Sequence, residues 1–247
     1  MGKVRVLGIA GSPRKNSNTA FLVKEALLAA QKVEGVETDF IDLAPLRIDH
    51  CNHCDKCLEP LRTGQGAFEC TNKKDGMAQV WPALEAADGL IFGAPVYLSG
   101  MNSKAKACLD RMRPYVWGGG CCYKVGGAIA VAMMEAGGGH DTTIQDIHNS
   151  LRMLEFITVS GLAQGGAGIS GPPYGPTILV KRDPNVVEVE KHGWGKWSAR
   201  LTGRRVAEVS RLIKLSKSAL GESFTRDYCQ CYHALVTDRK RLKEMLY

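Results

Sequence analysis

The sequence has no long hydrophobic segment, and this absence excludes several classes of protein. No apolar run in its 247 residues approaches the roughly 18 residues that a helix needs to cross a bilayer. The N-terminus, "MGKVRVLGIAGSPRK", meets charge too early to be a signal peptide. We therefore expect a cytoplasmic protein with no membrane partner. Because disulfides are rare in that reducing compartment, clustered cysteines there favour metal binding or redox chemistry.

Repeats, low-complexity tracts and a nucleic-acid-binding motif are also absent. Residues 200–247 contain 11 Lys and Arg against 5 Asp and Glu, and so carry most of the net charge of +7. Few aromatic residues interleave with these charges, so we expect no nucleic-acid partner. A basic segment of this kind suits either a solvated amphipathic helix or a face for an acidic partner.

Strand-like and helix-like segments alternate along the chain. The apolar patterns predict strands at residues 3–11, 36–43, 88–95, 124–132 and 156–163. They predict helices at residues 18–33, 75–87, 102–114, 142–154 and 195–218, and a Gly- and Pro-rich loop over 165–185. This alternation implies an α/β fold, a parallel sheet with helices on both faces. In such sheets ligands bind beyond the carboxyl ends of the strands.

The loop after the first predicted strand, "GSPRKNSNT" at residues 11–19, is typical of a phosphate site. It opens a helix, so backbone N–H groups and the positive end of the helix converge on it. Its polar side chains are Ser12, Arg14, Ser17, Asn18 and Thr19. The loop has neither GxGxxG nor GxxxxGK[ST], so a dinucleotide or a nucleoside triphosphate is not indicated. The alternative is an ordinary polar turn with a capped helix.

Four cysteines crowd the segment that follows the second predicted strand. They are Cys51, Cys54, Cys57 and Cys70. The first three recur at intervals of three in "DHCNHCDKCLEP", and the fourth follows after 12 intervening residues. Such a set suits an iron–sulfur cluster, a structural zinc site that uses four cysteines or borrows His50 or His53, or free thiols.

Three loops and two short motifs together resemble a known family. "GAPVY" (93–97) and "KAKACLDR" (104–111) follow the third predicted strand, and "MMEAGGGHDTT" (133–143) follows the fourth. With "GSPRKNSNT" they resemble the flavodoxin-like, NAD(P)H-dependent FMN reductases. The cysteine run narrows the resemblance to the iron–sulfur flavoproteins of that superfamily. The resemblance covers about residues 3–215, and "KKDGM" (73–77) departs from the family's "DDM" by a glycine in place of the second acid.

The resemblance implies a flavodoxin-like, doubly wound, five-stranded parallel sheet in the order 2-1-3-4-5. We expect a domain at 1–221 with a cluster loop at 49–75, and a helical extension at 222–247 that lies beyond the part resembling the family. The resemblance also implies FMN, with the phosphate held by the polar residues of the first loop. The ribityl chain and flavin ring would then meet Pro95, Val96, Tyr97, Leu98, Glu135, Ala136, Gly137, Gly138 and Gly139.

For the cysteines, the resemblance implies a [4Fe–4S] cluster with Cys51, Cys54, Cys57 and Cys70 as ligands, although the gap before Cys70 is longer than is usual in the family. His140 is a candidate proton donor to reduced flavin or substrate, or else a solvent-exposed residue at a helix start. Of the remaining cysteines, we expect Cys108 to be a buried apolar residue and Cys121 and Cys122 to be free thiols. Cys229 and Cys231 would belong to a second metal site or to a packed tail.

The expected function is that of an FMN- and [4Fe–4S]-containing oxidoreductase. It would pass electrons between NAD(P)H, or a one-electron carrier such as ferredoxin, and a small-molecule acceptor. One alternative is a cluster-free NAD(P)H-dependent FMN or quinone reductase, and another is a non-catalytic electron carrier or redox sensor. Family members are usually oligomers, so we expect a homodimer or homotetramer in which residues 222–247 pack on a neighbouring subunit.

Overall fold

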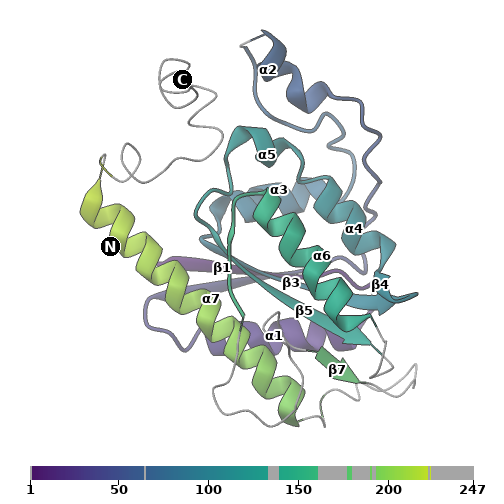
Figure 1. Cartoon of the computed structure of the whole chain (residues 1–247), viewed down its shortest axis with the longest axis vertical. Coiled ribbons are helices and arrows are strands. Elements are labelled where there is room, and N and C mark those ends of the chain that lie inside the picture. The colour runs from purple at the N-terminus through teal and green to yellow at the C-terminus, as the bar shows by residue number, and fades with distance from the viewer. Residues whose placement is uncertain are drawn as a thin grey trace.

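A central sheet with helices on both faces forms the body of the protein (Figure 1). The structure is a computed structural model that describes residues 2–63, 65–132, 139–160, 177–179, 190, 193–221 and 223. The expected extension at 222–247 lies outside the described residues except for Ser223, and so do Cys229 and Cys231. No helix in the described part of the chain is long and apolar enough to cross a membrane.

The sheet has the expected strand order. Its main strands are β1 (Val4–Ala10), β2 (Val36–Asp42), β3 (Gly89–Tyr97), β5 (Val125–Ala132) and β6 (Ile157–Thr158). These strands run parallel in the order β2-β1-β3-β5-β6, which is 2-1-3-4-5 when they are counted along the chain. The predicted flavodoxin-like fold is confirmed, and the carboxyl ends of the parallel strands share one edge of the sheet.

Two short strands extend the sheet beyond the prediction. β4 (Gly100–Met101) folds back antiparallel on β3, and β7 (Thr177–Leu179) pairs in parallel with the end of β5. The prediction of a loop throughout 165–185 is therefore wrong at β7. Of the expected fifth strand at 156–163, the described residues contain β6, which pairs with Val125 and Gly126, whereas residues 161–163 lie outside the described part. β7 takes the position beside Ala130–Ala132.

Helices fill the intervals between strands, as the apolar spacing predicts. They are α1 (Asn18–Ala30), α2 (Glu59–Thr63), α3 (Met77–Ala86), α4 (Ser103–Asp110), α5 (Pro114–Gly118), α6 (His140–Met153) and α7 (Gly193–Leu220), with a 3-10 turn at Lys56–Leu58. The predicted helix at 102–114 is divided in two. α4 ends at Asp110, and Pro114, which has no N–H to donate, lies in the first turn of α5.

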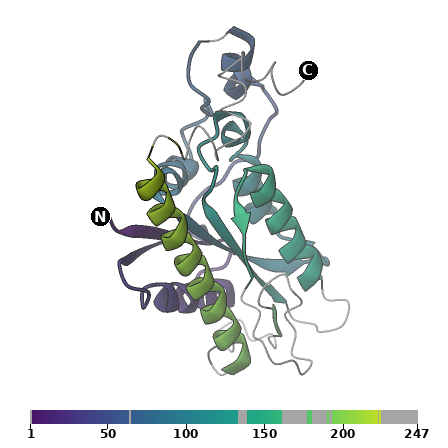
Figure 2. The same cartoon turned by 60° about the vertical axis from the view of Figure 1, so that its left-hand side comes forward.

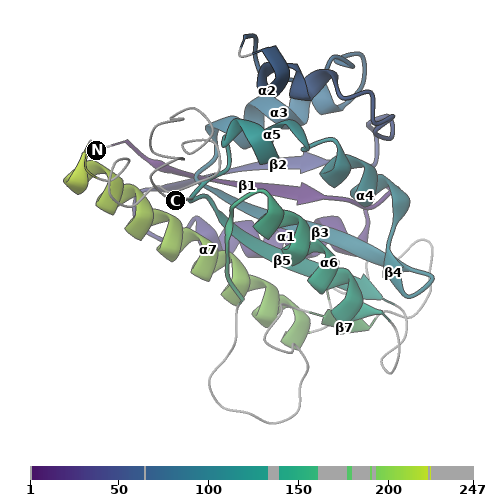
Figure 3. The same cartoon turned by 45° about the horizontal axis from the view of Figure 1, so that its top comes forward.

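Each face of the sheet packs against its own set of helices. α1 and α7 cover one face, where Val23, Ala26 and Val206 are fully buried, and Figure 2 shows the yellow-green α7 beside the purple α1. α3, α4 and α6 cover the other face, around Leu84 and Ile147 (Figure 3). Between the two layers β5 reads "VGGAIAVA", and all 8 of its residues are buried. Its continuous apolar sequence follows from having both faces covered.

Candidate functional site

The loop between β1 and α1 has the backbone geometry of an anion site. Ser17 precedes the helix, and its hydroxyl accepts a 3.1 Å hydrogen bond from the N–H of Ala20. The Ser12 hydroxyl accepts one of 3.2 Å from the N–H of Arg14. Ser12, Ser17 and Thr19 are all buried. The predicted phosphate residues therefore lie together at the positive end of α1, which favours a bound anion.

Contacts with the third-strand segment fix this loop in place. The side-chain amide of Asn102 donates a 2.8 Å hydrogen bond to the carbonyl of Gly11, and the N–H of Gly11 donates one of 2.7 Å to the carbonyl of Gly93. A Cβ on Gly11 would lie 2.6 Å from the Cβ of Ala105, so only glycine fits. The sequence analysis missed Asn102, whose place before the helix at "NSKAK" was the available signal.

The loop also contains a buried polar atom that fits a ligand. The Asn18 side-chain oxygen is buried and has no hydrogen-bond partner among the described residues. Native proteins rarely leave such groups unpaired. The amide can present either its oxygen or its NH₂ group, since the two are interchanged by a rotation of the side chain. Together with the buried hydroxyls, it makes the loop suitable for a phosphate.

A hairpin at the end of β3 forms the second part of the site. Pro95 is buried in the sheet, whereas Tyr97 is 45% exposed and Leu98 fully exposed at the tip. Leu98 and Ser99 both have positive φ, 46° and 61°, which a tight two-residue hairpin requires. The predicted flavin-contacting residues from Pro95 to Leu98 thus run from the sheet to the rim, with Val96 half-buried between them.

The start of α6 closes on this hairpin. Gly139 has φ of 79°, and a Cβ there would lie 2.4 Å from the backbone of Ser99, so the contact requires glycine. His140 is 8% exposed, which contradicts a solvent-exposed position at the helix start. The other predicted residues of this loop, Glu135, Ala136, Gly137 and Gly138, lie outside the described residues.

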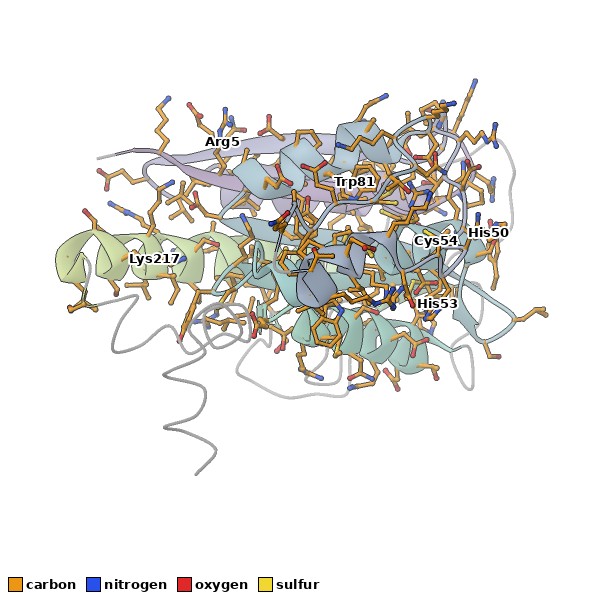
Figure 4. All side chains as sticks on the ribbon, turned by 90° about the horizontal axis from the view of Figure 1, so that it is seen from above. Arg5, His50, His53, Cys54, Trp81 and Lys217 are labelled. Atoms are coloured by element: carbon orange, nitrogen blue, oxygen red, sulfur yellow. The ribbon has the colours of Figure 1, made fainter. Side chains whose placement is uncertain are left out.

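The four clustered cysteines line one small pocket. Cys51, Cys57 and Cys70 are half-buried and Cys54 is exposed, and Arg111 and Arg113 line the same pocket. His50 also lines it, but the His53 side chain is 76% exposed. Figure 4 shows His50, His53 and Cys54 together at one end of the molecule, away from Arg5 and Lys217. The sequence spacing therefore corresponds to a real cluster of thiols in space.

Burial and charge shape the chemistry of these thiols. Burial raises the pKa of Cys57, while nearby Arg113 opposes that rise and the other three cysteines add to it. Arg113 donates a 2.7 Å hydrogen bond to Asp55 in the same loop. No three His, Cys, Asp or Glu side chains of the described residues surround a single ion position.

A buried ion pair holds the cysteine loop closed. Nη1 of Arg111 donates to Asp75 at 2.7 Å and to the carbonyl of Asp49 at 3.1 Å, and Nη2 donates to the carbonyl of Asn72 at 2.6 Å. Asp75 in turn accepts the N–H of Asp49 at 2.8 Å and that of Met77, the first residue of α3, at 3.1 Å. Both ends of the loop are therefore joined at Arg111 and Asp75.

The glycine that departs from the family's "DDM" has a steric reason. A Cβ on Gly76 would lie 2.7 Å from the Cβ of Leu46 and 3.1 Å from the carbonyl of Arg47. The N–H of Gly76 also donates a 2.8 Å hydrogen bond to that carbonyl. The chain before the cysteine loop thus packs directly on this position, and a second acid does not fit.

One short helix connects the two loops. Asn102, which precedes α4, bonds to the phosphate loop at Gly11. The Lys104 ammonium donates to the carbonyls of Leu43, Ala44 and Leu46, in the segment that leads to the cysteines. Arg111, which follows the last residue of α4, bonds to the cysteine loop itself. The motif "NSKAKACLDR" therefore positions both loops.

The other described cysteines are separate from this pocket. Burial raises the pKa of Cys108 to about 12 and that of Cys121 to about 12. Cys108 is a buried apolar residue, as predicted. Neither Cys121 nor Cys122 forms a disulfide among the described residues, which agrees with the prediction, and Cys122 is half-buried.

A second cavity adjoins the cysteine pocket. It has a volume of about 220 Å³ and shares Cys70 with that pocket. Its walls include Phe68, Trp81, Pro82 and Tyr115, and the Tyr115 hydroxyl donates a 2.8 Å hydrogen bond to Glu85. The sequence analysis did not predict this cavity, because its residues come from three separate segments, 68–73, 78–85 and 114–115.

Two proteins of a known family are similar in sequence to most of the chain. An iron–sulfur flavoprotein of Methanocaldococcus jannaschii is 36% identical over 215 residues, which are 85% of this chain and 100% of the relative. An iron–sulfur flavoprotein of Archaeoglobus fulgidus is 32% identical over 206 residues, 83% of this chain and 96% of the relative.

Solved structures share the fold at low sequence identity. RosB, solved with 8-demethyl-8-formylriboflavin-5′-phosphate bound, has a TM-score of 0.61 and 15% identity and covers 98% of this chain and 86% of its own. A WrbA-like flavodoxin from Agrobacterium tumefaciens has a TM-score of 0.54 and 17% identity, covering 86% of this chain and 99% of its own. The model of the NADPH-dependent FMN reductase family matches residues 4–166. The chain thus belongs to the NADPH-dependent FMN reductase family of flavin-dependent oxidoreductases and, within it, to the iron–sulfur flavoproteins.

Proposed function

We propose that the protein uses FMN and a [4Fe–4S] cluster to pass electrons between NAD(P)H, or a one-electron carrier such as ferredoxin, and a small-molecule acceptor. One observation carries the proposal: α4 and its flanking residues bond to both the phosphate loop and the cysteine loop. Asn102 and Arg111 are nine positions apart, which corresponds to roughly 13 Å along a helix. Both loops are therefore anchored to one rigid element of the same chain.

FMN would bind at the carboxyl ends of β1, β3 and β5. Ser12, Arg14, Ser17, Asn18 and Thr19 would hold its phosphate, because their loop combines a helix N-terminus with buried hydroxyls and an unpaired amide atom. The residues from Pro95 to Leu98, with the glycine-rich loop that ends at Gly139, would face the flavin. RosB was solved with a riboflavin-5′-phosphate derivative bound, and the matching family is described as NADPH-dependent FMN reductase. Both descriptions support FMN as the cofactor.

The cluster would be held by Cys51, Cys54, Cys57 and Cys70. Each iron of a [4Fe–4S] cluster takes one thiolate. Four thiols around one pocket can therefore bind its four irons without all four sulfur atoms approaching a single metal position. A zinc ion instead requires its ligands about 2 Å from a single centre. Arg111 and Arg113 line the same pocket, and guanidinium N–H groups suit hydrogen bonds to thiolates. The names of the relatives also support a cluster.

The two cofactors have different electron capacities. When bound, FMN exchanges one or two electrons and the cluster exchanges one at a time, so together they connect two-electron and one-electron partners. The chain supplies position and environment. Arg111 and Asp75 close the cysteine loop, and Asn102 fixes the loop that receives the phosphate. Half-burial of three of the cysteines limits the access of water to them.

Cofactor analysis of protein purified without oxygen tests the proposal. We expect about one FMN, with about four iron and four sulfide per chain, and a broad iron–sulfur absorbance beneath the flavin bands. FMN without iron would contradict the proposal and favour a cluster-free FMN or quinone reductase. Both cofactors without turnover of any acceptor by NAD(P)H or reduced ferredoxin would favour an electron carrier or sensor.

A further inference from the structure

The contacts that join the two ends of the cysteine loop converge on one side chain, Arg111, that the proposed function does not by itself require. We infer that Arg111 is the positioning residue of the cluster: it holds Cys70 in place and donates a hydrogen bond to its sulfur. The inference rests on the proposed function, since it concerns a ligand of the proposed cluster.

Cys70 lacks the local support that the other cysteines have. Cys51, Cys54 and Cys57 follow one another at short intervals and run into the 3-10 turn at Lys56–Leu58. Cys70 lies in a segment, 65–75, that contains no helix or strand. Its position must therefore be set by tertiary contacts rather than by secondary structure.

Arg111 provides those contacts on both sides of the cysteines. It bonds to the carbonyl of Asp49, two residues before Cys51, and to the carbonyl of Asn72, two residues after Cys70. Its side chain is 2% exposed, and that of its partner Asp75 is fully buried. A planar guanidinium with several donors in a fixed arrangement can hold these groups together, whereas the single ammonium of lysine cannot reproduce the arrangement.

The guanidinium lines the same pocket as the Cys70 side chain and has one donor without a partner among the described residues. Burial lowers the pKa of Arg111, but its hydrogen bond to Asp75 and the nearby Cys70 together outweigh burial and leave the pKa above its usual value. Nε is buried and has no hydrogen-bond partner of its own among the described residues. A neutral thiol is a weak acceptor, whereas an ionised one accepts strongly. The unpaired N–H therefore remains available to a sulfur ligand in the pocket that Arg111 and Cys70 share.

Arg111 would influence the cluster through the direction of its hydrogen bonds and not through its positive charge. Asp75 lies 2.7 Å away and balances the positive charge. Hydrogen bonds to the sulfur atoms are among the groups that set the reduction potential of an iron–sulfur cluster. Outer contacts of this kind typically change metal retention by 10- to 100-fold when they are removed.

Arg111→Lys tests the inference, because it keeps the charge and removes the guanidinium donors. In holoprotein prepared without oxygen, we expect iron release to a chelator to be at least about tenfold faster than in the wild type. The EPR spectrum of the reduced cluster should change, while FMN content stays the same. Arg47→Lys is the matched control, because Arg47 bonds to Asp49 in the same loop but is 81% exposed on its side chain. It should behave as the wild type.

Two further measurements separate a direct role from a merely structural one. Asp75→Asn weakens the loop but leaves Arg111, so its EPR spectrum should match the wild type, and a spectrum equal to that of Arg111→Lys would overturn the inference. Should Arg111→Lys fail to fold, pulsed EPR on protein labelled with ¹⁵N-arginine provides a test that leaves Arg111 intact. Arg113→Lys removes the other arginine that lines the cysteine pocket, so a ¹⁵N coupling can then be assigned to Arg111. In that variant a ¹⁵N coupling to the reduced cluster is expected, and its absence would overturn the inference.

Failure of the inference is distinct from failure of the proposed function. A wild-type protein that contains no iron contradicts the proposed function, and the inference with it. If the wild type contains the cluster, and Arg111→Lys matches it in iron release and EPR spectrum, the inference alone is contradicted.

Discussion

Nη1 of Arg111 lies 2.7 Å from Oδ2 of Asp75, and the two side chains are 2% and 0% exposed. The pair joins two motifs that are 36 residues apart in sequence, "KKDGM" and "KAKACLDR". It connects the end of α4 to the start of α3 and closes the cysteine loop between them. The pair therefore stabilises the folded arrangement of the cysteine loop.

The first prediction concerns the stability provided by this pair. Asp75→Ala leaves the Arg111 charge buried without a partner, and loss of one member of a buried pair costs about 3–5 kcal/mol. Urea unfolding of the purified protein measures the loss. Asp110→Ala is the control, because Asp110 pairs with Lys106 on the surface and such pairs contribute at most about 1 kcal/mol. Equal effects of the two substitutions would contradict the prediction.

The second prediction concerns FMN. Ser12→Asp combined with Ser17→Asp places carboxylates where the phosphate would bind, so the double variant should lose FMN. Asp is also a good residue before a helix, so the cap on α1 is preserved and the fold should remain intact. Flavin absorbance after gel filtration gives the occupancy. Ser216→Asp, at an exposed position on α7, should retain full FMN. Full occupancy in the double variant would exclude this loop as the phosphate site.

The third prediction concerns the cluster ligands. Changing Cys51, Cys54, Cys57 or Cys70 singly to Ala removes one thiolate, and iron without its full set is labile. Iron content should fall in each variant, whereas Cys108→Ala, in the apolar core, should keep normal iron. If Cys70→Ala retains its iron, another group supplies the fourth ligand. Among the described cysteines Cys122 would then be the first to test, since Cys121 is buried.

The fourth prediction concerns thiol reactivity. The thiolate is the form that reacts with iodoacetamide, and burial raises the pKa of both Cys108 and Cys121 to about 12. At neutral pH the cluster-free protein should label at the four clustered cysteines, more slowly at Cys57, whose pKa burial also raises, and leave Cys108 and Cys121 unmodified. Reconstitution with iron and sulfide should then protect the four. Peptide mass spectrometry gives the labelling at each site, and labelling of the four that is unchanged by reconstitution would contradict their role as ligands.

The fifth prediction concerns acid stability. Burial, aided by Arg152, lowers the pKa of His148 to about 4. Because the unfolded chain binds a proton near pH 6.5 and the folded chain does not, this residue's contribution to stability is present above pH 6.5 and is lost as pH falls toward 4. Between pH 7 and pH 5 the loss is about 2 kcal/mol.

His148→Leu checks this contribution. Both ring nitrogens of His148 lack hydrogen-bond partners among the described residues, so the substitution leaves no described group unpaired. Unfolding measured at pH 7 and pH 5 should show a smaller loss in the variant than in the wild type. The same pH dependence in both proteins would show that His148 is not the group that titrates.

The sequence by itself determined the five main strands, the phosphate loop and the spacing of the cysteines. These features depend on local patterns: buried strands have apolar runs, a helix start carries short polar residues, and cluster ligands recur at short intervals. Only the tertiary structure decided that β7 returns to β5, that Asn102 holds Gly11, and that Asp75 meets Arg111. Such contacts join segments far apart in the chain. They are selected by packing and by the cost of leaving buried polar groups unpaired, neither of which a local pattern contains.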